Sequence, residues 1–350
     1  MEHNTYADGK RYYSLDSYFK NRYGSKVFKV SLNAGFTCPN IDGTKGFGGC
    51  TYCSSSGSGD FAGNPSESLE TQFKNIVEVM HRKWKNVSLY MPYFQAHTNT
   101  YAPVSELREK FYAALDYGKE LPEGERPEII GIAIATRPDC LNDEIYELLA
   151  EINEKTFMWV ELGLQSSNPV TGETINRCHP VSDHDEACRR LAELGIRTVV
   201  HMIFGLPKTL IPAEYDADGN LIKDAVIVPE TREEMLETVR HACAPVGYNK
   251  TTGSDRIFGI KLHMLNIVKG SQMERLCPNY VPFQSIEEYA DLAVDAVKII
   301  PREITVHRLS ADAPRKILIA PEWSYMKRTI LNTIHQKLAE QDIWQGQDAE

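Results

Sequence analysis

The sequence predicts an α/β fold, namely an incomplete (β/α)6 TIM-like barrel with a C-terminal α/β extension. Strand-like and helix-like segments alternate along most of the 350 residues, which is typical of βα units joined in a parallel sheet. Residues 129–134 are continuously apolar, as in strands that are covered on both faces. Six such units fit an incomplete barrel, whose chemistry is expected at the carboxyl ends of the strands.

Each element follows from its local pattern. Strands are predicted where β-branched and other apolar residues cluster, and helices where apolar residues such as Leu69, Phe73 and Ile76 recur at helical spacing. One helix opens after Pro103, and another ends before Gly195. The predicted strands are 26–32, 87–94, 128–136, 157–165, 197–204 and 256–266, and the helices are 66–85, 104–117, 142–153, 182–194 and 230–243.

Two segments interrupt this alternation. Residues 208–229 and 244–255 are polar and rich in turn residues, so both are interpreted as surface insertions. After Gly270 the pattern predicts a helix at 285–300, a short strand at 304–307 and a last helix at 323–340. The predicted organisation is therefore an N-terminal extension (1–25), a core barrel (26–270) with a glycine-rich loop (33–60), and a C-terminal extension (271–350) that closes the open side.

The first 25 residues are rich in tyrosines and basic side chains. Aromatic rings among cations are used to bind single-stranded RNA. A helix that packs its Tyr and Phe side chains onto the barrel would explain the same composition, and both interpretations remain open. The residues concerned include Lys10, Arg11, Tyr12, Tyr13, Tyr18, Lys20, Arg22 and Tyr23.

Composition limits the possible partners and compartment. The longest apolar runs stay below eighteen residues, so no membrane span is expected, and the N-terminus lacks a signal-peptide pattern. Eight cysteines without a regular framework favour a reducing cytoplasm. The net charge is −10, from 38 basic and 48 acidic residues, so any nucleic-acid partner would have to meet a local basic patch.

Three cysteines directly after the first predicted strand are the strongest chemical signal. Cys38, Cys50 and Cys53 follow the spacing Cys-x11-Cys-x2-Cys, with four glycines between the first two. A four-iron cluster normally takes four thiolates, so three would leave one iron open to a ligand that is not protein. The glycines permit the turns and the close backbone approach that a cluster requires.

A structural zinc site is the alternative interpretation of these cysteines. Such a site is closed by four ligands, so a fourth would have to come from elsewhere in the chain. Cys140, His81 and His97 are the candidates.

The segment Cys50-Thr51-Tyr52-Cys53 resembles the C-x-aromatic-C end of the cluster loop in radical S-adenosylmethionine (SAM) enzymes. This resemblance implies that the open iron chelates the amino and carboxylate groups of SAM, and that Tyr52 lies by the adenine. The usual first spacing is three residues, and the spacing of eleven here indicates a subfamily.

Further motifs lie at other predicted strand ends. Alternation places Glu161, Gly163 and Gln165 on one strand face, and polar groups inside a barrel are costly unless they bind something. The superfamily uses this strand for the SAM ribose. Coproporphyrinogen-oxidase-like members keep a Gln and an Arg at the separation of Gln165 and Arg177, which implies that Arg177 binds the SAM carboxylate.

Two more strand ends are similar to SAM-binding motifs. The motif around Ile203, from His201 to Pro207, resembles the fifth-strand segment that holds the adenine, although His201 stands where an Asp is common. Gln95 follows the second strand, and in the superfamily the end of this strand normally binds the amino group of SAM. The common Gly-Gly-Glu form of that motif is absent here.

The tetrapeptide Thr136-Arg137-Pro138-Asp139 resembles one in the catalytic subunit of Elongator, a radical SAM enzyme of wobble-uridine modification. Arg137 would suit an anionic substrate group or SAM, or it would clamp Asp139. Cys140 would supply a hydrogen atom or would simply be packed, as buried cysteines commonly are. Lys261 and His263 share a strand face, so both are expected to face the barrel interior, or His263 is a satisfied core histidine.

Together these motifs resemble one radical SAM family, the Elongator-like bacterial proteins known as YhcC and YtqA. The resemblance covers about residues 10–345, and segment 56–64 is most similar to the YtqA branch. The resemblance to that branch implies a role in maturation of the tRNA wobble uridine. The implied reaction converts 5-carboxymethylaminomethyl-uridine into 5-aminomethyl-uridine, the activity called MnmL. The two insertions depart from the branch.

The resemblance implies a complete catalytic scheme. A [4Fe–4S] cluster on the three cysteines passes one electron to bound SAM, and the 5′-deoxyadenosyl radical abstracts hydrogen from an unactivated C–H bond. The implied partners are tRNA, whose wobble carboxymethyl group would pair with Arg137, and an electron donor such as flavodoxin or ferredoxin, with no membrane. Two alternatives remain: a radical SAM enzyme for a small metabolite, which the acidic charge favours, and a zinc-binding RNA adaptor without enzyme activity.

Overall fold

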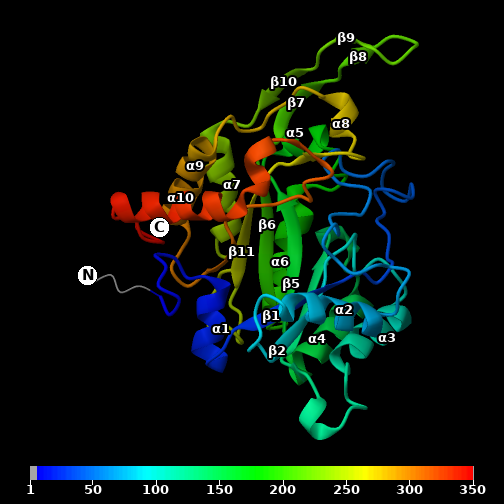
Figure 1. Cartoon of the computed structure of the whole chain (residues 1–350), viewed down its shortest axis with the longest axis vertical. Helices are drawn as coiled ribbons and strands as arrows, with labels where there is room; N and C mark the ends of the chain where they lie inside the picture. The colour runs from blue at the N-terminus through cyan, green and yellow to red at the C-terminus, as the bar shows by residue number, and fades with distance from the viewer. Residues whose placement is uncertain (1–5, 350) are drawn as a thin grey trace.

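Seven parallel strands form one sheet in the computed structural model, which describes residues 6–349 (Figure 1). The strand order follows the chain, so β1 and β13 are the two edges of an incomplete barrel, and the predicted fold class is confirmed. β5 and β6 have their predicted bounds. The strands are β1 (Val27–Leu32), β2 (Leu89–Phe94) with the short β3 (Glu128–Ile129) beside it, β4 (Gly131–Thr136), β5 (Phe157–Gln165), β6 (Arg197–Phe204), β11 (Gly259–Met264) and β13 (Thr305–Arg308).

Helices cover the outer face of this sheet and form the larger core with it. Their starts are fixed by side-chain caps: Ser68 accepts the Thr71 N–H at the start of α2, and Thr231 and Glu234 form a capping box on α7. The helices are α1 (Leu15–Tyr23), α2 (Leu69–His81), α3 (Val104–Leu115), α4 (Asp143–Lys155), α5 (Pro169–Thr174), α6 (Val181–Glu193), α7 (Arg232–Cys243), α8 (Met273–Leu276), α9 (Ile286–Ile299) and α10 (Lys327–Glu340), with short 3-10 turns at Glu123–Glu125, Pro138–Cys140 and Glu322–Tyr325.

A second, smaller core fills the amino end of the barrel interior. Phe157, Trp159 and Phe258 come from the first residues of their strands or just before them, and they pack against Leu15 and Phe19 of α1. Phe19 is 2% exposed. The N-terminal aromatics therefore pack onto the barrel, which is the second of the two interpretations of this segment; residues 1–5 lie outside the described residues.

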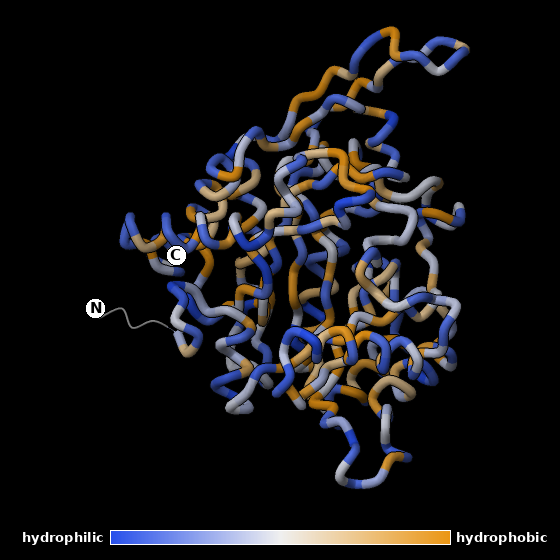
Figure 2. The backbone as a smooth tube through the Cα atoms, in the orientation of Figure 1, coloured by the Kyte–Doolittle hydropathy of each residue, from blue (hydrophilic) through white to orange (hydrophobic). Residues whose placement is uncertain are grey.

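The segment predicted as a polar insertion at 208–229 forms two antiparallel hairpins that project from the barrel (Figure 1). β7 (Pro207–Ile211) pairs with β10 (Val226–Pro229), and β8 (Glu214–Tyr215) pairs with β9 (Leu221–Lys223). Apolar residues lie along this arm, as Figure 2 shows, and Ile222 is 66% exposed. The sequence predicted the surface position of this segment but not its strands.

The C-terminal segment contributes directly to the sheet, because β13 pairs in parallel with β11. A further antiparallel pair joins β12 (Ile267–Val268) to β14 (Leu318–Ala320). The division of the chain into an extension, a core and a second extension remains a prediction. In residues 6–349, none of the helices combines the length and the hydropathy needed to cross a bilayer.

Candidate active site

A cavity of about 670 Å³ runs through the barrel from the carboxyl ends of the strands toward the open side between β1 and β13. Ten of the eleven predicted site residues line it: Cys38, Cys50, Cys53, Tyr52, Gln95, Arg137, Glu161, Gln165, Arg177 and Ile203. Residues from distant parts of the chain therefore meet at one place, as expected for parallel strands that end at the same rim.

The loop that carries the cysteines is held in place by hydrogen bonds to the segments that follow α5 and precede α8. Thr51 N–H donates to Ile175 O at 3.0 Å, and Asn176 Nδ2 donates to Gly49 O at 2.8 Å. Gln272 Nε2 donates to Gly48 O at 2.7 Å. Gly48 and Gly49 have φ of 77° and 80°, which favours glycine at both positions.

The three cysteines that line the cavity are half-buried. Burial raises the pKa of Cys53 to about 12 and also raises the pKa of Cys50, while Asn40 Nδ2 donates to Cys50 Sγ at 3.5 Å. A buried thiol gives up its proton when a metal ion compensates the charge. The three cysteines thus suit metal binding better than they suit free nucleophiles.

The spacing of the thiols separates the two metal interpretations. Zinc–sulfur bonds of about 2.3 Å would bring three Sγ atoms to within about 4 Å of one another. In the described residues, the three-residue group of possible metal ligands within 4.8 Å of one another is His184, Asp185 and His241, and it contains no cysteine. The three Sγ atoms therefore do not all lie within 4.8 Å of one another, which is a wider spacing than the ligands of a single zinc ion would have.

Two of the three proposed fourth zinc ligands, His81 and Cys140, do not line the main cavity. His81 Nε2 contacts Tyr90 Oη at 2.8 Å and Val87 O at 3.1 Å, at the end of α2. Cys140 lines a separate cavity. His97 does line the main cavity, but Gly57 lies directly against its ring.

The wall above the barrel interior fits a polar ligand such as SAM. Buried polar atoms without a hydrogen-bond partner in the described residues cost free energy, and several of them lie in this wall. They are Gln165 Oε1, His97 Nδ1, His201 Nε2, His263 Nε2 and Asn266 Oδ1. Tyr52 and Ile203, the predicted adenine contacts, belong to one hydrophobic cluster beside these atoms, which suits an aromatic base.

Gln165 is the last residue of β5, and Arg177, which follows α5, reaches back to the same strand end, but the two side chains act differently. Gln165 has φ of 59° and folds back over Gly163, where an added Cβ would lie 2.2 Å from Gln165 Nε2. Arg177 is 2% exposed and donates from Nη1 to Leu164 O at 2.7 Å and to Ser166 O at 2.6 Å. Arg177 therefore clamps the strand end while it lines the cavity, and its contact with a SAM carboxylate remains a prediction.

Gln95 lies where it was predicted, at the end of β2. Its Nε2 donates to Ser58 O at 3.0 Å, so this amide ties the cysteine loop to the strand.

Glu161 lines the cavity and makes contacts within the barrel that the sequence did not predict. Tyr93 Oη donates to Glu161 Oε2 at 2.6 Å, Trp159 Nε1 donates to Oε1 at 2.9 Å, and Lys261 forms an ion pair with Oε2. Burial alone would raise the pKa of Glu161, but the Lys261 and Lys29 ammoniums outweigh it and hold this pKa well below its usual value. Lys261 therefore compensates the desolvation cost of the Glu161 carboxylate, and the contact of Glu161 with the SAM ribose remains a prediction.

Arg137 lines the cavity but is engaged by Asp139, as the clamp interpretation predicted. Arg137 Nε and Nη2 each donate to this carboxylate at 3.0 Å, and Lys45 pairs with it at 2.8 Å. Cys140 lies outside the main cavity, and burial raises its pKa to about 12. A catalytic role for Cys140 therefore remains a prediction to which the geometry adds no support.

The sequence did not predict most of the cations that lie at the open side of the barrel. Lys29 on β1, Lys261 on β11, Arg308 at the end of β13 and Lys327 at the start of α10 all line the cavity. A single lysine inside the apolar strand Val27–Leu32 was the signal that could have identified Lys29. Lys261 and His263 both line the cavity, which confirms that their shared strand face looks inward.

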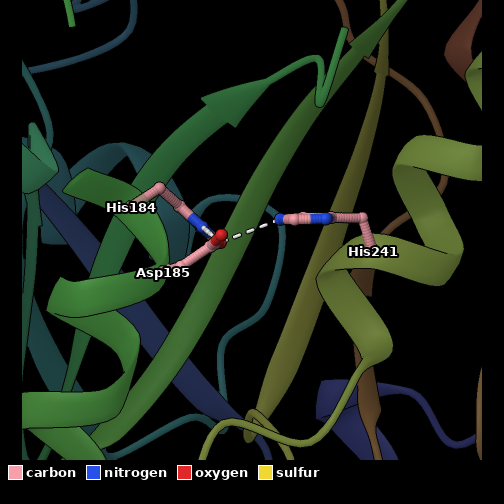
Figure 3. Close-up of side chains that lie close together, drawn as sticks. All are labelled: His184, Asp185 and His241. Atoms are coloured by element: carbon pink, nitrogen blue, oxygen red, sulfur yellow. Dashed lines mark hydrogen bonds and ion pairs between the residues drawn. The ribbon is translucent and has the colours of Figure 1, made fainter. Parts of the chain in front are cut away.

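The group formed by His184, Asp185 and His241 lies on α6 and α7, outside this cavity (Figure 3). Asp185 Oδ1 accepts from His241 Nε2 at 2.8 Å and from His184 Nδ1 at 3.3 Å. Hydrogen bonding between the two helices accounts for this arrangement.

An incomplete parallel barrel with three free thiols in the wall of its cavity is the arrangement expected of a radical SAM protein. Two family profiles agree with this class. The Radical SAM superfamily profile matches residues 43–211, and that of the Radical_SAM C-terminal domain matches residues 257–340. The protein is accordingly an enzyme of this superfamily, and the superfamily implies a [4Fe–4S] cluster and SAM.

Two relatives place the chain more narrowly. It is 40% identical over 338 residues to YtqA of Bacillus subtilis, covering 96% of this chain and 92% of that protein. It is 32% identical over 324 residues to YhcC of Escherichia coli, covering 92% and 90% of the two chains. The chain belongs to the radical SAM family that contains YtqA and YhcC.

More distant similarities concern the fold and part of the sequence. The structure of Elp3 from Methanocaldococcus infernus superimposes with a TM-score of 0.60 at 14% identity, over 91% of this chain and 64% of that one. A tRNA uridine(34) acetyltransferase of Dehalococcoides mccartyi is 24% identical over 230 residues, which are 64% of this chain and 43% of that enzyme.

Proposed function

We propose that this radical SAM enzyme modifies the wobble uridine of tRNA, converting 5-carboxymethylaminomethyl-uridine into 5-aminomethyl-uridine. The observation that carries the proposal is the charge of the cavity. Six cationic side chains line it (Lys29, Arg137, Arg177, Lys261, Arg308 and Lys327) against three carboxylates (Asp60, Glu161 and Asp312), although acidic residues outnumber basic ones in the whole chain by 48 to 38. The sequence similarity to a tRNA uridine(34) acetyltransferase and the resemblance to the YtqA branch support the same substrate.

Different residues of the cavity would bind the cofactors and the substrate. Cys38, Cys50 and Cys53 would hold the cluster, and the Tyr52–Ile203 side of the wall would receive the adenine of SAM. When bound, the cluster and SAM supply a 5′-deoxyadenosyl radical that abstracts hydrogen from the substrate.

The direct test compares modified nucleosides in tRNA from a deletion strain and its parent. The proposal predicts that the deletion strain accumulates the carboxymethylaminomethyl form and lacks the aminomethyl form. Complementation with the wild-type gene or with Cys243→Ala should restore the profile, because Cys243 is buried in the outer core; Cys38→Ala should not. Identical profiles in the two strains would exclude this function.

A small anionic metabolite is the second candidate substrate, since the same cationic cavity and the acidic surface are compatible with it. Unchanged tRNA in the deletion strain, together with SAM cleavage by the purified enzyme in the presence of a cell extract of small molecules, would favour this candidate.

A further inference from the structure

The open side of the barrel is lined by cations from both edge strands. β1 and β13 are the edges of the sheet, and they carry Lys29 and Arg308. Lys327, at the start of α10, completes the set, and all three line the same cavity. We call these three residues the seam cations.

The carboxylates near the seam do not neutralise this charge. Glu161 is already paired with Lys261. Asp312 is shared, since it lies 3.1 Å from Lys327 and 3.9 Å from Arg308. Two of the four nearby cations therefore lack a carboxylate of their own.

Lys29 is the least satisfied of these groups. Within residues 6–349 its ammonium makes neither a hydrogen bond nor an ion pair, and it lies 4.9 Å from the centre of the Tyr93 ring and 5.8 Å from that of Trp159. Lys29 is half-buried, and these cation–π contacts compensate part of the desolvation of its ammonium. Burial, reinforced by the charge of Lys261, lowers the pKa of Lys29 to about 7. A bound anion would complete the coordination of this ammonium and keep it protonated.

The geometry points to an oxyanion-binding subsite for the substrate at the seam, with Lys29 as the central contact and Arg308 and Lys327 beside it. The inference rests on the proposed function and deepens it, because it assigns the carboxylate of the modified base to the seam and not to Arg137. Arg137 already donates twice to Asp139, whereas Lys29 has its donors free. A phosphate of the RNA has the same oxyanion chemistry and is the other source of the ligand.

Binding to the reconstituted holoenzyme tests the inference without turnover. With SAM present and the cluster kept oxidised, fluorescence anisotropy would compare two anticodon stem-loops. One carries 5-carboxymethylaminomethyl-uridine, and the other carries its methyl ester, which lacks the carboxylate charge but keeps the amine. Wild-type enzyme should prefer the acid by about tenfold to a hundredfold, the range of a hydrogen bond to a charged group.

Variants identify the residue and the source of the oxyanion. Lys29→Met should lose the preference for the acid, while Lys29→Arg keeps most of it. Lys20→Met removes the same charge on α1, far from the cavity lining, and should behave as wild type. If Lys29→Met weakens both RNAs equally, the oxyanion is a phosphate. Arg308→Gln provides a second variant at a side chain that is 34% exposed, in case Lys29→Met does not fold.

A probe without RNA separates failure of this inference from failure of the proposed function. Calorimetry with N-methylglycine and with inorganic phosphate should show binding to the wild-type enzyme that Lys29→Met loses. Binding of these probes by an enzyme that ignores both stem-loops would refute the tRNA substrate and keep the subsite. Normal discrimination of acid from ester by Lys29→Met and Arg308→Gln, or no binding of either probe by the wild type, would overturn the subsite.

Discussion

At the scale of single residues, partners decide what a polar side chain inside the barrel does. Glu161 and Gln165 share one face of β5, and the sequence predicted both as SAM contacts. Glu161 is satisfied by Lys261, a residue 100 positions away, whereas Gln165 Oε1 has no partner in the described part of the chain. The alternation of the strand could predict the shared face, but the ion pair depends on which strand lies across the barrel.

Gly163 provides a test of the role of Gln165. In Gly163→Ala the new Cβ would meet Gln165 Nε2 at 2.2 Å and displace the amide. SAM binding to the reconstituted enzyme, measured by equilibrium dialysis, should weaken about tenfold, which corresponds to about 1.4 kcal/mol. Iron content should stay at the wild-type level. Gly124→Ala is the control, because nothing lies within 4 Å of its added Cβ; equal SAM affinity in the two variants would refute the role of Gln165.

The buried histidines predict a dependence of stability on pH. Burial, together with the charge of Lys261, lowers the pKa of His201 from 6.5 to about 3. The unfolded chain therefore takes up this proton first as the pH falls, so the stabilisation is complete above about pH 6.5 and decreases by about 1.4 kcal/mol per pH unit below it. Between pH 6.5 and pH 5, the free energy of unfolding should fall by about 2 kcal/mol less in His201→Asn than in the wild type. Urea unfolding at both pH values measures this difference, and equal losses would contradict it.

At the scale of elements, some strands could be predicted from their local sequence, whereas the pairing of others depends on distant segments. The bounds of β5 and β6 could be predicted, because both segments are rich in apolar residues and lie between segments with helical spacing. The pairing of β12 with β14 could not, because two short segments about 50 residues apart carry no periodic signal. The hairpins of the arm were also missed, since their exposed strands alternate with polar turn residues.

Helix α1 closes the amino end of the barrel, and its removal from the core should destabilise the whole sheet. Phe19→Ala deletes a 2% exposed ring that packs near Phe157 and Trp159, so it should lower the free energy of unfolding by about 3–5 kcal/mol. Lys20→Ala, on the exposed side of the same helix, removes a surface ion pair and should cost at most about 1 kcal/mol. Similar losses in the two variants would show that α1 is not part of the core.

At the scale of the whole molecule, an acidic chain encloses a cationic cavity in an incomplete barrel. The motifs predicted the fold class and the rim where the cysteines lie, because each motif follows a strand in the sequence. The seam cations come from β1, β13 and α10, which are far apart in the sequence and meet only in the folded protein. The sequence contains no local motif with both Lys29 and Arg308, so it could not predict that these residues line one cavity.

The central claim is that three thiols hold a four-iron cluster with one iron available to SAM. Anaerobic reconstitution followed by electron paramagnetic resonance of the reduced protein tests it most directly. The account predicts about four irons per chain, a cluster signal that changes when SAM is added, and loss of both in Cys38→Ala. A colourless protein with one zinc per chain, or a cluster signal that SAM leaves unchanged, would contradict it.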